Sequence, residues 1–265
     1  MARIGFIGMG NMGGAILHGL LKVYGPEELI FTAAHQEKME QVTSETKVPH
    51  GTSNRDCAKS VKYLVLAVKP QYFDVVFAEI KDVLTPEQVV ISLAPGISIA
   101  NITERLGGNV RVVRAMPNTP AMLGAGMTGV AFQASAYTDE ERREIEVIFT
   151  SCGKMELVEE RLMDAVGCVS GSSPAFVYMF IEALADSGVK YGLPRKTACA
   201  MAAQTVLGSA QMVLETGKHP GQLKDEVCSP GGTTIAGVSA LEEHGLRNAV
   251  IKAADACYEK TQRMK

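Results

Sequence analysis

Three glycines near the start of the chain have the spacing of a phosphate-binding turn. The run Gly8-Met9-Gly10-Asn11-Met12-Gly13 follows an apolar, strand-like segment, Arg3–Ile7, and opens a helix-like one, Asn11–Tyr24. In such a turn the first glycine permits the sharp bend, the second lets the backbone approach a pyrophosphate, and the third lets the helix pack closely on the strand. The helix N-terminus adds N–H donors. The pattern predicts a dinucleotide site; the alternative is a glycine-rich corner that binds nothing.

The end of the second predicted strand, Leu29–Thr32, indicates which dinucleotide binds. NAD-binding proteins usually carry Asp or Glu there, which accepts a hydrogen bond from the ribose 2′-hydroxyl. This chain continues with Ala33-Ala34-His35-Gln36, and no acid comes before Glu37. The missing carboxylate removes repulsion against a 2′-phosphate, and Thr32, His35 and Lys38 are available nearby. NADP(H) is therefore favoured, with NAD(H) as the alternative because no arginine is present.

Three further loops follow strand-like runs, at the edge where a doubly wound sheet binds its ligands. They are Ala67-Val68-Lys69-Pro70, Ala94-Pro95-Gly96 and Met116-Pro117-Asn118-Thr119-Pro120. Their prolines end the strands and fix rigid turns. Lys69 is a candidate general acid or phosphate contact, and the alternative is a solvated lysine at a strand end.

A second group of chemically suggestive residues is the run Cys228-Ser229-Pro230-Gly231-Gly232-Thr233-Thr234, which precedes a helical pattern. Its proline and glycines impose an unusual backbone, and hydroxyls at a helix N-terminus can hold a small carboxylate. An ordinary helix cap would explain one Ser or Thr but not the whole run. No nearby histidine could act as a base, which disfavours a nucleophilic serine or cysteine.

The elements that must position these residues change in type along the chain. Apolar runs alternate with helical patterns at first, which predicts an α/β fold with a doubly wound parallel sheet covered on both faces. The clearest helix, Thr138–Ser151, begins with the capping-box spacing of Thr138 and Glu141. The predicted strands are Arg3–Ile7, Leu29–Thr32, Tyr63–Val68, Val89–Leu93, Arg111–Ala115, Gly129–Gln133 and Lys154–Val158.

After Glu160 only helical patterns follow, with stops at Gly192, Gly217 and Gly245. Their apolar surface, rich in Ala and Met, needs a cover and suggests a subunit interface. We therefore predict a dinucleotide-binding domain over 1–158 and a helical substrate and dimerisation domain over 159–265. The predicted helices are Leu162–Tyr191 (interrupted near Ser172–Pro174), Pro194–Thr216, a short one from Gly221, Thr234–Glu243 and Leu246–Thr261.

Composition excludes several classes of protein. Lys and Arg number 26 against 29 Asp and Glu, a net charge of −3, so no basic surface for nucleic acid is expected. The apolar stretch Ala165–Ala185 is interrupted by glycine, serine and Pro174, and we expect its helical part to be too short to span a membrane. The six cysteines and five histidines lack metal-ligand spacing, so no metal site is expected. These features predict a cytoplasmic protein.

Taken in order, these motifs resemble the pyrroline-5-carboxylate reductase family along nearly the whole chain. The resemblance also includes Gly171-Ser172-Ser173-Pro174-Ala175 and His219-Pro220-Gly221-Gln222-Leu223. It implies a Rossmann domain, a helical C-terminal domain that forms homodimers, and dimers gathered into decamers. It also implies reduction of the cyclic imine 1-pyrroline-5-carboxylate to L-proline by NAD(P)H, the last step of proline biosynthesis.

Carried over by position, the resemblance assigns the site residues. It places Thr234 closest to the imine nitrogen, as the catalytic residue. Substrate would be held by Ser229, Gly232, Thr233 and Thr234. Cofactor would be held by Ile7, Gly8, Met9, Gly10, Asn11, Met12, Gly13, Ala34, His35, Asn54, Ala67, Val68, Lys69, Pro70, Ala94, Pro95 and Gly96.

Two rival functions remain open at this point. Enzymes of the 3-hydroxyacid dehydrogenase kind share a glycine-loop domain followed by helices, but they use a helix-borne lysine, and Gly167–Val189 contains none. The other rival function is that of a non-catalytic nucleotide-binding module that senses redox state. The lack of strong acids suits imine reduction, because a cyclic imine can arrive protonated and a positioned hydroxyl then suffices.

Overall fold

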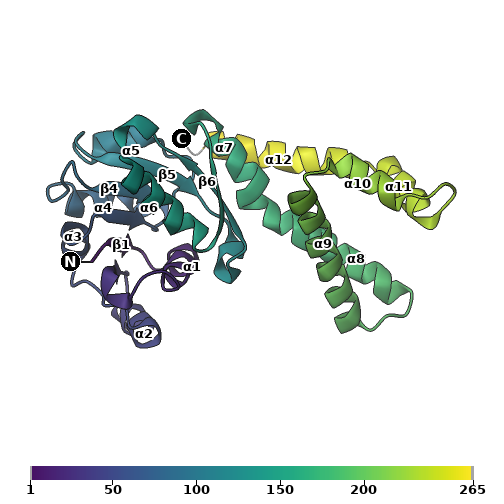
Figure 1. Ribbon diagram of the computed structural model, residues 1–265, viewed down its shortest axis with the longest axis horizontal. Helices are drawn as coiled ribbons and strands as arrows, with labels where there is room; N and C mark the ends of the chain where they lie inside the picture. Colours follow the sequence, from purple (N-terminus) through teal and green to yellow (C-terminus); the bar gives the residue numbers. More distant parts are fainter. Residues whose placement is uncertain (1, 264–265) are drawn as a thin grey trace. The chain divides into compact units, whose positions relative to one another are not determined.

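Seven strands form one sheet in the order β2-β1-β3-β4-β5-β6-β7, within a computed structural model that describes residues 2–263 (Figure 1). Strands β1 to β5 run parallel, β6 is antiparallel to β5, and β7 is parallel to β6. The predicted parallel, doubly wound sheet is confirmed for β1 to β5, whereas β6 and β7 both run in the opposite direction. The strands are β1 Ile4–Ile7, β2 Leu29–Thr32, β3 Tyr63–Leu66, β4 Val89–Ser92, β5 Arg111–Met116, β6 Gly126–Ala131 and β7 Gly153–Leu157.

Both faces of this sheet are buried. In β3, Tyr63 and Val65 belong to one apolar cluster, whereas Leu64 and Leu66 belong to the other. Side chains of α1, α2 and α6 complete the first cluster, and those of α3, α4 and α5 the second. Burial on both faces explains why the strands lack polar alternation. These helices are α1 Asn11–Leu20, α2 Gln36–Thr46, α3 Asn54–Lys59, α4 Phe73–Ile80, α5 Ile99–Arg105 and α6 Asp139–Thr150.

The rest of the chain is helical. The expected stops at Gly192, Gly217 and Gly245 are confirmed, since all three have positive φ after a helix. The expected interruption is a π-helical section, Gly167–Ser172, rather than a break. The helices are α7 Met163–Val166, α8 Ser173–Lys190, α9 Arg195–Thr216, α10 Pro220–Val227, α11 Thr233–Glu243 and α12 Leu246–Gln262.

The chain divides into two compact units, one made of Met1–Ser172 with Cys257–Lys265 and the other of Ser173–Ala256. The first unit therefore extends beyond the sheet. Arg114 of β5 donates to Asp164 at 3.0 Å, and the other oxygen of that carboxylate accepts from Gln262 at 2.8 Å. These bonds tie the region of α7 and the end of α12 to the sheet. The division at residue 158 stays a prediction about functional domains.

The second unit buries little of its apolar surface. Met179 of α8 is 69% exposed and Leu214 of α9 is 75% exposed. By length and composition alone, Glu160–Lys190 and Arg195–Thr216 could each cross a membrane. The expectation that the first stretch is too short is wrong, because the π-helical section carries the helical run through Pro174. These exposed helices need a cover, which α8 and α9 do not find within their own unit.

Buried charges hold α6 under the sheet. The predicted capping box of Thr138 and Glu141 is confirmed. Glu141 is 3% exposed, and its carboxylate accepts from Arg111 at 2.7 and 2.9 Å and pairs with Lys62 at 3.0 Å. These two cations stand at the starts of β5 and β3. Mainly through the Arg111 hydrogen bonds, the pKa of Glu141 falls to about 2.

We expect Glu141→Gln to lower the free energy of unfolding at neutral pH, by no more than about 3 kcal/mol from the pKa shift. The folded pKa lies below the ordinary 4.5, so this stabilisation is complete above pH 4.5 and is lost as the pH falls toward 2. Urea unfolding of both proteins from pH 7 to 3 measures it. The difference between them should shrink with acidification; a constant difference would contradict the assignment.

Candidate functional site

The glycine loop has a different constraint at each of its three glycines. Gly8 follows β1 at φ +100°, and a Cβ added there would lie 2.7 Å from the Val68 side chain. A Cβ on Gly13 would lie 2.5 Å from the carbonyl oxygen of Gly8. A Cβ on Gly10 would meet nothing within 4 Å. The fold itself therefore requires the first and third glycines, whereas the second faces open space where a ligand could approach.

A cavity of about 420 Å³ lies over this loop, between the ends of β2 and β3. It gathers most of the predicted cofactor residues, and no Asp or Glu lines it. Its basic groups are His35, Lys38 and Lys69. The predicted residues that line it are Ile7, Gly8, Met9, Gly10, Ala34, His35, Asn54, Ala67, Val68 and Lys69.

Three lining residues were missed by the sequence analysis: Tyr72, Val75 and Val76, at the start of α4. They offer an apolar wall for a flat ring. The signal that could have found them is their place directly after Pro70, at the carboxyl end of β3. Asn54 on the same wall is held in place, because its Oδ1 accepts from Thr32 Oγ1 at 2.6 Å and its Nδ2 donates to Glu79 at 2.7 Å.

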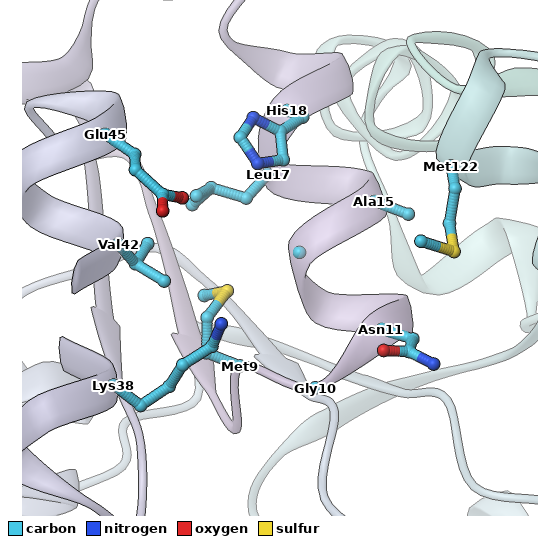
Figure 2. Close-up of a pocket in the computed structure, with 11 residues that line it drawn as sticks. Met9, Gly10, Asn11, Ala15, Leu17, His18, Lys38, Val42, Glu45 and Met122 are labelled. Carbon is cyan, nitrogen blue, oxygen red and sulfur yellow. The ribbon is translucent and has the colours of Figure 1, made fainter.

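A smaller cavity of about 280 Å³ lies between α1 and α2 and shares Met9, Gly10 and Lys38 with the first (Figure 2). Asn11 lines it at the start of α1. Figure 2 shows the Lys38 side chain reaching from α2 toward the glycine loop. The two cavities thus meet at the glycine loop.

The remaining predicted cofactor residues lie outside these two cavities. Pro70 and Gly96 line a separate cavity of about 510 Å³. Ala94 and Pro95 line a very small one beside Arg114 and Asp164, which Gly96 also lines. Met12 and Gly13 lie within α1, where Gly13 packs against the loop.

The loop after β5 has a structural role in this unit. Asn118 is buried; its Nδ2 donates to the Ser170 carbonyl at 3.0 Å, and its Oδ1 accepts from the Met127 N–H at 2.9 Å. Ser170 belongs to the π-helical section. Asn118 thereby links β5, β6 and that section.

The predicted substrate residues lie together in the second unit. The turn between α10 and α11 has Gly231 at φ +68°, and the N–H of Gly232 donates to the Ser229 carbonyl at 3.0 Å. A Cβ on Gly232 would lie 2.4 Å from Ser229 Oγ, a hydroxyl that can rotate away, so it is the positive φ of Gly231 that favours glycine in this turn. Thr233 and Thr234 begin α11 and are exposed. Gly232 is the N-cap and no side chain caps the helix, so Thr234 does not act as its cap.

Comparisons with known proteins converge on one kind of enzyme. Residues 160–264 match the family model "Pyrroline-5-carboxylate reductase dimerisation", and residues 3–96 match "NADP oxidoreductase coenzyme F420-dependent". The chain is 44% identical to pyrroline-5-carboxylate reductase of Escherichia coli, over 99% of this chain and 98% of that one. The Coxiella burnetii enzyme is 36% identical, with a TM-score of 0.92 over 100% of this chain and 98% of that one. The Plasmodium falciparum enzyme, solved with NADP bound, is 32% identical, with a TM-score of 0.88 over 99% and 98%.

Proposed function

The chain belongs to the pyrroline-5-carboxylate reductase family, and from that premise we propose how its residues share the reduction of 1-pyrroline-5-carboxylate to L-proline by NAD(P)H. The observation that carries this function is the similarity over the full length, which includes both the glycine-loop unit and the dimerisation domain. The same similarity disfavours both rival functions, the 3-hydroxyacid dehydrogenase and the redox-sensing module.

We propose that the cavity over the glycine loop holds the dinucleotide. Two features of the residues fit it: the open space beside Gly10 admits a pyrophosphate, and no carboxylate faces the cavity to repel one. The N-terminus of α1 would face the phosphates, and the apolar wall of Tyr72 and Val76 would take the adenine. Bound nicotinamide supplies the hydride. NADPH is the preferred cofactor in this proposal, since no acid stands at the end of β2.

The turn before α11 forms the substrate site of this proposal. Ser229, Gly232 and Thr233 would hold the carboxylate, and Thr234 Oγ1 would hydrogen-bond the ring nitrogen. Reduction adds a hydride to the imine carbon, and the electrons of the C=N π bond stay on nitrogen. When the imine arrives protonated, no further proton is required. The role of Thr234 is then to orient the ring and stabilise its nitrogen.

An absorbance assay with NADPH and 1-pyrroline-5-carboxylate tests this function. We expect NADPH consumption that depends on the imine and yields L-proline. A 3-hydroxy acid with NADP⁺ is the control for the dehydrogenase alternative and should give no NADPH. Binding of NADPH without turnover of the imine would instead support the sensor alternative.

The assembly follows from the helical unit. The chain carries a dimerisation domain, and a partner would cover the exposed faces of α8 and α9. We propose that the dimers gather into decamers and that the enzyme is cytoplasmic.

Light scattering at micromolar concentration should therefore give at least twice the chain mass of 28.3 kDa. A value near ten times that mass supports the decamer, whereas an active monomer would contradict the dimer. Because α8 and α9 could also enter a membrane by composition, sedimentation with lipid vesicles is the control, and the protein should stay in the supernatant.

A further inference from the structure

We infer that Lys38 binds the 2′-phosphate of NADPH and thereby sets the preference for NADPH over NADH. The inference rests on the proposed cofactor site and assigns one of its contacts. It concerns the end of β2, where proteins with this sheet topology bind the adenosine ribose.

The residues directly after β2 cannot perform this task. Ala33 and Ala34 have no side-chain donor. The hydroxyl of Thr32 donates to Asn54 Oδ1 at 2.6 Å, so its proton is already used. A phosphate at this strand end must find its donors further along the chain.

Lys38 meets the requirement through its place and its charge. It lies in the first turn of α2 and lines both cavities that meet at the glycine loop (Figure 2). Within residues 2–263 its Nζ forms no ion pair and only a long hydrogen bond, 3.4 Å, to Gln41. The larger of the two cavities has no carboxylate in its lining, although Glu45 lines the smaller one, and an ammonium group with no counter-ion of its own attracts a phosphate.

The other basic groups fit less well. Lys69 follows β3, which lies on the opposite side of β1 from β2. Arg55 lines a neighbouring cavity of about 460 Å³, but Glu79 lines that cavity too and would repel a phosphate. His35 lines the same cavity as Lys38 and can add a hydrogen bond, but it lacks the long, flexible side chain and ammonium group of a lysine.

Fluorescence titration of NADPH and of NADH into the full-length protein tests the assignment, alongside steady-state kinetics. For Lys38→Gln we expect the Kd for NADPH to rise about tenfold, because one charge-assisted hydrogen bond is lost, and the Kd for NADH to change less than about twofold. Added salt should weaken NADPH binding to the parent more than to the variant. Lys59→Gln removes an exposed lysine from the end of α3 and should change neither constant.

Three results would overturn the inference: an equal loss for both coenzymes, a selective loss in Arg55→Gln instead, or a parent that binds NADPH no more tightly than NADH. Failure of the proposed function has a different signature. A parent that binds NADPH selectively through Lys38 but does not reduce the imine would leave the phosphate contact standing and remove the reaction.

Discussion

Thr234→Ala should lower kcat/KM for the imine by about 10- to 150-fold, because it removes a hydrogen bond to a group that is charged during the reaction. The threonine lies in the first turn of α11, is exposed, and is not the helix cap. Its loss should therefore cost the protein little stability. NADPH affinity should also change little, since the glycine loop and the strand ends lie in the other unit. Steady-state kinetics, a cofactor titration and a melting curve on one variant measure all three.

Two further variants make the result specific. Thr234→Ser keeps a hydroxyl at the same position and should recover much of the activity. Ser239→Ala removes a hydroxyl from the same helix, one that donates to the Ile235 carbonyl, and should leave turnover near normal. Activity of Thr234→Ala within about threefold of the parent would show that the hydroxyl is dispensable. The group that contacts the ring nitrogen would then be sought at Lys69 or in bound water.

Gly10→Val should raise the Kd for NADPH by about tenfold or more while the protein stays folded. The added side chain meets no protein atom within 4 Å of its Cβ, and the backbone at φ −79° suits valine. The new methyl groups would occupy the space into which the pyrophosphate must come. Fluorescence titration gives the affinity, and thermal unfolding gives the stability.

Gly13→Ala is the matched control in the same loop, because it should lower the stability of the protein, whereas Gly10→Val should lower its affinity for NADPH. A Cβ at Gly13 would lie 2.5 Å from the Gly8 carbonyl oxygen, so α1 must shift and the melting temperature should fall. Unchanged affinity in a folded Gly10→Val protein would remove the dinucleotide site from this loop. A large loss of stability in Gly10→Val would show instead that the open space beside Gly10 is needed for folding.

Much of the fold could be predicted because its signals are local. The residues of β1 and β2 are apolar apart from Thr32 at the end of β2, with no polar alternation, and the strands lie where these runs are. Two further sequence patterns each predict a single structure. Thr138 with Glu141 predicts a capping box, and the glycines after α8, α9 and α11 predict helix ends. The direction of β6 could not be predicted, because it depends on a single turn of 3₁₀ helix, Thr119–Leu123, which is too short for a parallel crossover.

In the candidate site, too, some features could be predicted from the sequence and others could not. The glycine loop and the turn before α11 are each contiguous in sequence, so the chain itself displays them. The partners of Asn54 are Thr32 and Glu79, which come from a strand and a helix far away in sequence. The sequence offers Lys38 only as one of three candidates near the end of β2, and it is α2 that places it beside Met9 and Gly10. Contacts of this kind follow from tertiary packing and from no local pattern.

The return of α12 to the sheet unit makes folding during synthesis a process in two stages. The ribosome delivers every strand of the sheet by Leu157, but Gln262, which donates to Asp164, emerges only after residues 173–256. At about 5–20 residues per second, the interval between Leu157 and Gln262 is on the order of 5–21 s. Until then Asp164 lacks one of its hydrogen-bond donors. A premature stop within residues 173–256 would thus leave the nucleotide-binding sheet incomplete in its packing, although no strand is missing.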